Sequence, residues 1–361
     1  MKFILIVDAM NQTFADRFKS ARLRSGFSLQ ELANKLNNQI TKQALHKYEK
    51  GAVVPDSERL GLLSNVMNVR PDYFFRETSI QIGELAYRSL KSVPAKEEYK
   101  VVEQTREYLS RYLELEEILG LENKFENPLA DFGLVSEYAQ VNLAADLLRK
   151  KWEMGKDPIY NVAELLEDKF IKVVEIDAHT NFNGMQTWVN GSIPVVAFNI
   201  NLKGKPDRIR FTLLHELGHL LLNFGEVTEN QKETLCHQFA GAILMPEETL
   251  KQELGAHRNR LSLQELGNIK KHYGISMQAI VRRALECGIV NDHFTKQFLN
   301  MMKEMGWKTI EPVAYEGVEK SNRFDQLIFR GIAEEQISMT KAAALKNMKL
   351  AEFHSMSLTL A

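Results

Sequence analysis

The 361-residue sequence has little cysteine, almost no net charge and no long apolar run. Its two cysteines, Cys236 and Cys287, have no paired spacing, which argues against a disulfide framework and a thiolate metal site. With a net charge of -1, the chain as a whole has no electrostatic attraction to nucleic acid or membrane, so any such binding must come from a local charged surface. Residues 3–7 are too short an apolar run for a signal peptide, and no segment has the roughly 18 apolar residues that cross a bilayer. We therefore expect a cytoplasmic protein without a membrane partner.

The length predicts two or three domains, each large enough to bury a core. Helical periodicity dominates, so we predict a mainly α fold with a small β-sheet, in the α+β class. The boundaries that we predict are residues 11–78, a helical linker at 79–128, a third unit at 129–291 and a C-terminal helical region at 292–361. Met1 and Met10 are both candidates for the native start.

Two histidines four residues apart flank a glutamate in the apolar run at residues 211–222. On a helix, His215 and His219 share one face about one turn apart and can bind one metal ion. Glu216, next to the first histidine, is placed to take a proton from a water molecule at the metal. The surrounding leucines predict burial, and Gly218 inside the helix indicates a close packing partner. This HExxH pattern predicts zinc chemistry.

A catalytic zinc ion takes three protein ligands and leaves the fourth position to water. A second helix, predicted at residues 228–244, carries Glu233 and His237 four apart. We choose Glu233 as the third ligand, because a carboxylate commonly joins two histidines in peptidases, with His237 orienting it. The reverse assignment stays open, with His237 as ligand and Glu233 as its support. Glu226 and Glu229 in the intervening loop are further candidates.

The blocks at residues 210–222 and 233–246 together resemble the ImmA/IrrE family of metallo-endopeptidases. That family joins the zinc helix to a Glu-x-x-Ala-x-x-Phe-Ala helix and a Leu-Met-Pro ending. This chain departs from it at Cys236, where alanine is usual, and at His237, where asparagine or aspartate is common. The resemblance implies a zinc endopeptidase whose substrate is a protein, typically a repressor of a mobile element or stress regulon.

Residues 11–76 contain residues typical of helix starts and helix ends, at spacings that predict a series of short helices. A capping box from Ser28 to Glu31 begins the second helix, and Thr41 is placed to cap a third. Helix, turn and helix is the arrangement in which the third helix enters the DNA major groove. Eleven Lys or Arg stand against six Asp or Glu between Met10 and Arg76, which favours DNA. The residues that we place at the groove are Thr41, Lys42, Gln43 and Lys47.

This stretch resembles the helix-turn-helix domain of the XRE family of repressors, with a turn about two residues longer than is usual there. Helix-turn-helix proteins commonly bind two half-sites as dimers. The amphipathic linker is therefore either a homodimer-forming helix or a simple packing helix. Short strands predicted at 171–176, 185–189 and 195–199 form a small sheet, whose exposed edge could pair with an extended substrate.

Together these patterns predict a DNA-binding transcriptional regulator with a zinc-dependent endopeptidase domain. Its substrate would be a repressor, antitoxin or toxin-type protein in a phage or stress response. One alternative is a transcription factor or antitoxin whose zinc domain recognises a partner or signal without turnover. Another is a peptidase attached to a purely structural bundle. For residues 292–361 we hypothesise a substrate-recruiting or effector-sensing role.

Overall fold

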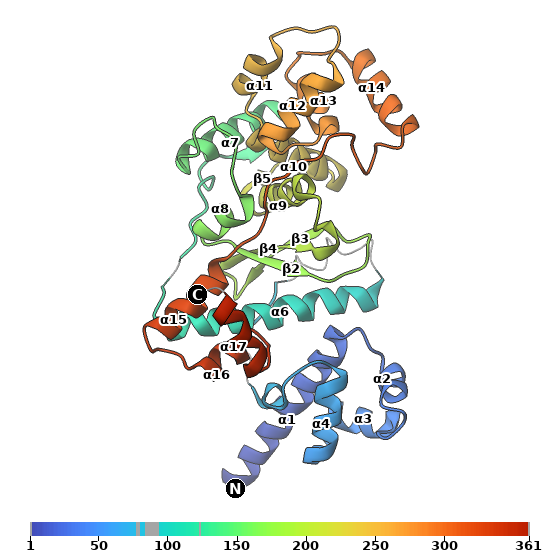
Figure 1. The fold of residues 1–361 in the computed structure, drawn as a ribbon, viewed down its shortest axis with the longest axis vertical. Helices are drawn as coiled ribbons and strands as arrows, with labels where there is room; N and C mark the ends of the chain where they lie inside the picture. Colours follow the sequence, from blue (N-terminus) through green and yellow to red (C-terminus); the bar gives the residue numbers. More distant parts are fainter. Residues whose placement is uncertain (1, 77–79, 84–93, 123, 360–361) are drawn as a thin grey trace.

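The computed structural model describes residues 2–76, 80–83, 94–122 and 124–359. An N-terminal helical bundle lies at one end, helix α6 (Ala95–Ile118) crosses the middle, and a larger body of helices and strands lies beyond it (Figure 1). The predicted class, mainly α with small β-sheets, is confirmed. No helix in the described part of the chain is long and apolar enough to cross a membrane.

The N-terminal bundle surrounds one apolar core in which Phe14, Phe18, Leu32 and Leu45 are buried. Its first helix begins at Lys2 and so runs through the boundary that we predicted at residue 11. The elements are α1 (Lys2–Arg24), α2 (Leu29–Lys35), α3 (Lys42–Glu49), α4 (Ser57–Val66) and the 3-10 helix η1 (Pro71–Phe75).

Side-chain caps determine where α2 and α3 begin. The capping box predicted at Ser28 and Glu31 is present, and the Thr41 hydroxyl accepts a hydrogen bond from Ala44 N. Asn37 and Asn38 both have positive φ angles in the turn between the helices. Asparagine tolerates this left-handed backbone better than most residues, which accounts for the long turn.

Helix α6 is the element on which the rest of the chain is assembled. Val101 and Leu109 pack against the central sheet, whereas Tyr112 and Leu115 pack against the C-terminal helices. Because these apolar side chains are buried within the chain, α6 is a packing helix here. A homodimer stays a prediction.

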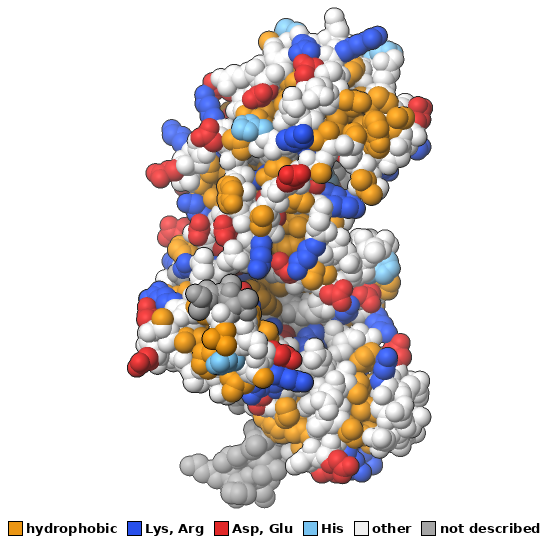
Figure 2. All heavy atoms as spheres, viewed as in Figure 1, with side chains coloured by type: hydrophobic (Ala, Val, Ile, Leu, Met, Phe, Trp, Pro, Cys, Tyr) orange, Lys and Arg blue, Asp and Glu red, His pale blue; other side chains and the backbone are white. Residues whose placement is uncertain are grey.

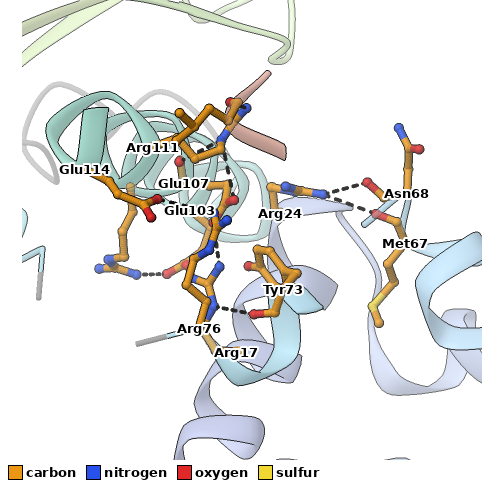
Figure 3. A network of polar contacts seen from close by, with 12 residues as sticks. Arg17, Arg24, Met67, Asn68, Tyr73, Arg76, Glu103, Glu107, Arg111 and Glu114 are labelled. Carbon is orange, nitrogen blue, oxygen red and sulfur yellow. Dashed lines mark hydrogen bonds and ion pairs between the residues drawn. The ribbon is translucent and has the colours of Figure 1, made fainter. Parts of the chain in front are cut away.

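The bundle contacts α6 through a buried ion pair (Figure 3). Arg17 Nη2 donates to Glu107 Oε2 over 2.8 Å, and the two side chains are 4% and 5% exposed. The Arg17 guanidinium also lies 3.7 Å from the centre of the Tyr73 ring. On the other side of Glu107, Arg111 donates to the carbonyl of Leu345 in the C-terminal region. This network joins the bundle, α6 and the C-terminal helices.

The central sheet has three strands in the order β2-β4-β3, with β2 parallel and β3 antiparallel to β4. One face packs on α6 and the other on α9, so the sheet lies between them. Ile82 pairs antiparallel with Val189 at one end of the β3 edge. The strands are β2 (Lys172–Ile176), β3 (Gly184–Val189) and β4 (Ile193–Asn199).

The remaining body surrounds the largest apolar core. A short parallel pair, β1 with β5, lies beside its helices. The elements are β1 (Leu134–Val135), α7 (Tyr138–Lys151), α8 (Val162–Asp168), the 3-10 helix η2 (Ile200–Leu202), α9 (Pro206–Leu221), β5 (Asn223–Phe224), α10 (Glu229–Leu244), α11 (Glu247–Leu254), α12 (Leu263–Tyr273), α13 (Met277–Glu286) and α14 (Asp292–Glu304).

The predicted C-terminal region divides between two cores. Phe298 and Met302 of α14 belong to the largest core, and hydrophobic side chains gather beside this helix on the face shown in Figure 2. Residues 305–322, which we call the strap, return along the body to the last helices (Figure 1). These helices pack with α6 in a separate core. They are α15 (Arg323–Ala333), α16 (Met339–Leu345) and α17 (Leu350–Thr359).

Candidate active site

Helix α9 carries the two histidines and the glutamate of the motif. Pro206 stands in its first turn, where the missing N–H costs nothing, and leucines surround the motif in the core. His215 and His219 keep 11% and 18% of their side chains exposed. Glu216 is buried. The helix therefore presents two partly accessible imidazoles at the edge of the apolar core.

Helix α10 packs very closely on α9. A Cβ at Gly218 would lie 3.2 Å from Cys236 Sγ and 3.3 Å from Phe239 Cδ1. The close packing partner predicted from Gly218 is thus confirmed. Because the two helices lie this close together, Glu233 in the first turns of α10 can reach both histidines.

Three potential ligand atoms converge between the helices. Glu233 places its carboxylate oxygens 3.2 Å from His215 Nε2 and 3.3 Å from His219 Nε2, and the two Nε2 atoms lie 3.3 Å apart. Tetrahedral ligands at about 2.0–2.1 Å from zinc would lie roughly 3.3 Å from one another. Two facing Nε2 atoms can share only one proton, whereas a cation satisfies all three side chains. The donor set and its spacing therefore fit a zinc ion.

His237 lies beside this cluster. Its ring centre is 4.3 Å from that of His215, and it shares with His215 and Glu233 a group whose ligand atoms lie within 4.8 Å of one another. We expected His237 to orient the Glu233 side chain, but its Nδ1 lies 2.6 Å from the Glu233 backbone carbonyl instead. This contact leaves Nε2 available, so His237 keeps its place as the alternative ligand.

Burial and the Glu233 carboxylate shift the pKa values of the two histidines in opposite directions. Burial lowers the pKa of His215 to about 4, despite its hydrogen bond to Glu233. Burial also opposes the charged form of His219, but the hydrogen bond to Glu233 and the charge of Glu216 outweigh it and raise the pKa of His219. Hydrogen bonds from both histidines hold the pKa of Glu233 far below its usual range. At neutral pH the cluster thus contains a carboxylate and a neutral His215, which are the ligand forms.

Glu216 lies on the sheet side of α9, against the first residue of β3. A Cβ at Gly184 would lie 3.4 Å from Glu216 Cγ, 2.9 Å from Ala197 O and 2.6 Å from Thr212 Cγ2. Only glycine allows the strand to lie this close to the helix. Burial raises the pKa of Glu216 to about 7, although the charge of His219 opposes the shift. A carboxyl group with this pKa can accept and return a proton near neutrality.

The role of Gly184 was missed in the sequence, where the Asn183-Gly184 pair reads as a turn. Of the other loop acids, Glu229 lies 2.9 Å from Lys232, and Glu226 is exposed. His215 Nδ1 is buried without a hydrogen-bond partner among the described residues. Histidine ligands usually donate this proton to a carbonyl or carboxylate, so this ring lacks the usual support.

The predicted DNA contacts lie far from the cluster, on the N-terminal bundle. Thr41, Lys42, Gln43 and Lys47 are all exposed on or beside α3. Thr41 also caps the helix, so its hydroxyl is partly engaged. His46 is exposed on the same short helix and was missed in the sequence.

Comparison with known families agrees with both halves of this description. Residues 167–285 match the M78 peptidase family, described as an IrrE N-terminal-like domain, and residues 18–74 match a helix-turn-helix family. The chain therefore joins a helix-turn-helix domain to an IrrE-like domain of a metallopeptidase family. Such a family implies a divalent metal ion.

Two relatives match separate parts of the chain. The radiation response metalloprotease IrrE of Deinococcus radiodurans is 41% identical over 68 residues, which cover 15% of this chain and 21% of that protein. An uncharacterized SPbeta prophage-derived HTH-type transcriptional regulator of Bacillus subtilis, YonR, is 38% identical over 68 residues, which cover 19% of this chain and 61% of that protein. The chain thus covers less than two thirds of either relative.

Proposed function

We propose that this protein is a DNA-binding regulator whose IrrE-like domain hydrolyses a peptide bond in a protein partner of the repressor, antitoxin or toxin type. The observation that carries the proposal is the convergence of His215, His219 and Glu233 beside a buried Glu216. The names of the relatives support it, since one is a metalloprotease and the other a transcriptional regulator. We keep residues 129–291 as the peptidase domain and add α6, which covers one face of its sheet.

His215, His219 and Glu233 would hold zinc in this site. When bound there, zinc lowers the pKa of water toward about 7 and polarises a carbonyl group. Glu216 is on the same helix as both histidines, and its burial keeps its carboxyl group away from competing solvent. We assign it as the general base that takes a proton from the attacking water and then passes it to the leaving amine.

The substrate would lie along the edge of β3. Among the described residues, this strand pairs with β4 along one side, and Ile82 and Gly83 cover the far end of its other side. Gly83 N donates to Trp188 O over 2.9 Å, as a paired substrate strand would. The end of the edge at Gly184 lies against Glu216. A peptide paired there would have its backbone beside the base.

DNA would bind on the exposed side of α3. Lys42 and Lys47 supply positive charge, and Gln43 can pair bidentately with adenine. The ion pairs of the bundle with α6 include those of Arg17 in α1 and Glu31 in α2, whereas the predicted contact residues of α3 are exposed while the bundle is attached to the rest of the chain. DNA and a protein substrate could therefore be bound at the same time.

A Glu216→Gln variant tests the peptidase directly. It should retain zinc, because Glu216 is not a ligand, and should lose about 10²–10⁴-fold in cleavage of the protein encoded by the neighbouring gene. Zinc content is measured by elemental analysis, and cleavage by electrophoresis and mass spectrometry. The matched control is Glu229→Gln, which changes an exposed acid at the start of α10 and should cleave normally. Binding of that partner without cleavage by the wild-type protein would favour recognition without turnover.

A further inference from the structure

A groove leads away from the metal-ligand cluster between α9 and α13. Its inner pocket, of about 300 Å³, has Thr212 and His237 in its wall and so begins at the cluster. An outer pocket of about 360 Å³ ends against strap residues 308–315. Asp207 and Arg208 line both pockets. The two pockets adjoin along these residues, and we call them together the α9–α13 groove.

The outer wall of the groove is anchored to α13. Glu311 of the strap accepts hydrogen bonds from Met277 N and Gln278 N, over 2.9 and 3.1 Å. Lys308 also contributes its carbonyl, which accepts from Gln278 Nε2 over 3.2 Å. The strap is thus attached to the first turn of α13 by several hydrogen bonds. A preformed groove of this kind binds a peptide with little cost of ordering its own walls.

The α9–α13 groove is basic although the whole chain has a net charge of -1. Six Lys or Arg and three Asp or Glu line the two pockets. Buried cations engage the acids: Lys270 Nζ lies 2.7 Å from Asp207 and 2.8 Å from Glu311, and Glu286 lies 3.9 Å from Arg283. The four other cations form no close ion pair among the residues that the structure describes, although the charge of Glu286 also acts on Arg282: Lys205, Arg208, Arg282 and Lys308.

The groove combines apolar and basic side chains, and the apolar ones in the inner pocket lie near His237. Phe211 and Ala279 line the inner pocket, and the Phe211 ring centre lies 5.9 Å from that of His237. The exposed Arg208 and Arg282 belong to the same pocket, and the outer pocket adds Lys205 and Lys308. A bound peptide would therefore place an apolar side chain near the cluster and its next residues among cations.

We propose that the α9–α13 groove selects an acidic segment of the protein substrate, with an apolar residue next to the bond that is cut. This inference rests on the proposed peptidase function and adds the class of substrate. The guanidinium groups of Arg208 and Arg282 can each bind a carboxylate through two parallel hydrogen bonds. A basic segment would instead meet the positive charges of Lys205, Arg208, Arg282 and Lys308 and be rejected.

Binding of two labelled ten-residue peptides to the zinc-loaded Glu216→Gln protein tests the groove. Both peptides contain the same central Phe-Leu pair, flanked by Asp and Glu in one and by Lys in the other. Fluorescence anisotropy at about 50 mM salt should show that the acidic peptide binds at least about tenfold more tightly, with the ratio shrinking as salt screens the charges. Equal affinities, or tighter binding of the basic peptide, would overturn the proposal.

Reversing the charge of two groove arginines tests whether the preference for the acidic peptide arises in the groove. Arg208→Glu with Arg282→Glu should abolish or invert it, since both side chains are exposed and their replacement leaves the core intact. The matched control reverses two exposed cations outside the groove, Lys151→Glu with Lys349→Glu, and should keep the wild-type ratio. Zinc content and melting temperature of each variant show that it is folded. An undiminished preference in the groove variant would refute the assignment.

Cleavage of the same peptides by the wild-type protein distinguishes failure of the peptidase function from failure of the groove proposal. If the acidic peptide binds preferentially but neither peptide nor any candidate protein is cut, the peptidase function fails and the groove stands as a docking site. If both peptides are cut with equal kcat/KM, the peptidase function stands and the groove proposal fails. Preferential cleavage of the acidic peptide supports both.

Discussion

Replacing Gly184 by alanine should damage the catalytic arrangement without removing any functional side chain. The added Cβ would lie 2.6 Å from Thr212 Cγ2 and 2.9 Å from the backbone oxygen of Ala197. Thr212 can change its rotamer, but Ala197 is in the neighbouring strand β4, whose backbone cannot yield alone. β3 must therefore shift relative to β4, and with it relative to Glu216 on α9. We expect a loss of about 1–3 kcal/mol in stability and roughly 10–100-fold in kcat/KM.

Thermal unfolding and cleavage of the partner protein measure the two effects. Adding Thr212→Ser to Gly184→Ala removes the methyl group at 2.6 Å but keeps the Ala197 contact, so recovery should be partial. Gly61→Ala is the matched control, because a Cβ there meets nothing within 4 Å and α4 should gain up to about 1 kcal/mol. A Gly184→Ala protein with wild-type stability and activity would show that the close strand–helix approach is not required.

Three further predictions concern other parts of the chain. Arg17→Ala leaves the buried Glu107 with Arg111, 3.6 Å away, as its one ion-pair partner among the described residues. It should cost about 2–3 kcal/mol and increase proteolysis between the bundle and α6, and unchanged proteolysis would contradict this. Arg210→Met leaves the buried Glu319, which lies 3.1 Å from Arg210 Nε, without its ion-pair partner and should lower stability by about 3–5 kcal/mol. Adding Glu319→Gln should restore part of this stability, and an additive double mutant would refute the coupling. Lys47→Ala should weaken binding to promoter DNA and reduce the slope of log affinity against log salt by about 0.9. Mobility shifts at several salt concentrations measure this slope, and an unchanged slope would show that Lys47 does not contact DNA.

Local signals in the sequence predict most helices and the common face of the two histidines. Capping residues such as Ser28 and Thr41 act within three positions, and the spacing of His215 and His219 fixes their common face on one helix. Glu233 was within reach of prediction because the helix that carries it follows directly in the chain.

Contacts between distant segments could not be predicted in the same way. The Arg17–Glu107 pair joins residues 90 positions apart, and the strap meets α13 through Glu311. Neither position has a residue pattern that identifies its partner. Gly184 reads as part of a turn until the strand is seen against Glu216. Sequence patterns therefore indicated the residues of the candidate metal site better than the surroundings that would position substrate.

Anomalous diffraction at the zinc edge from crystals of the wild-type protein would test the metal site most directly. We predict one strong peak about 2.0–2.2 Å from His215 Nε2, His219 Nε2 and a Glu233 carboxylate oxygen, and none in crystals of a His219→Ala variant. A peak held by His237 in place of Glu233 would reassign the third ligand. Zinc-loaded crystals with no peak between α9 and α10 would contradict the metal site and the peptidase function that depends on it.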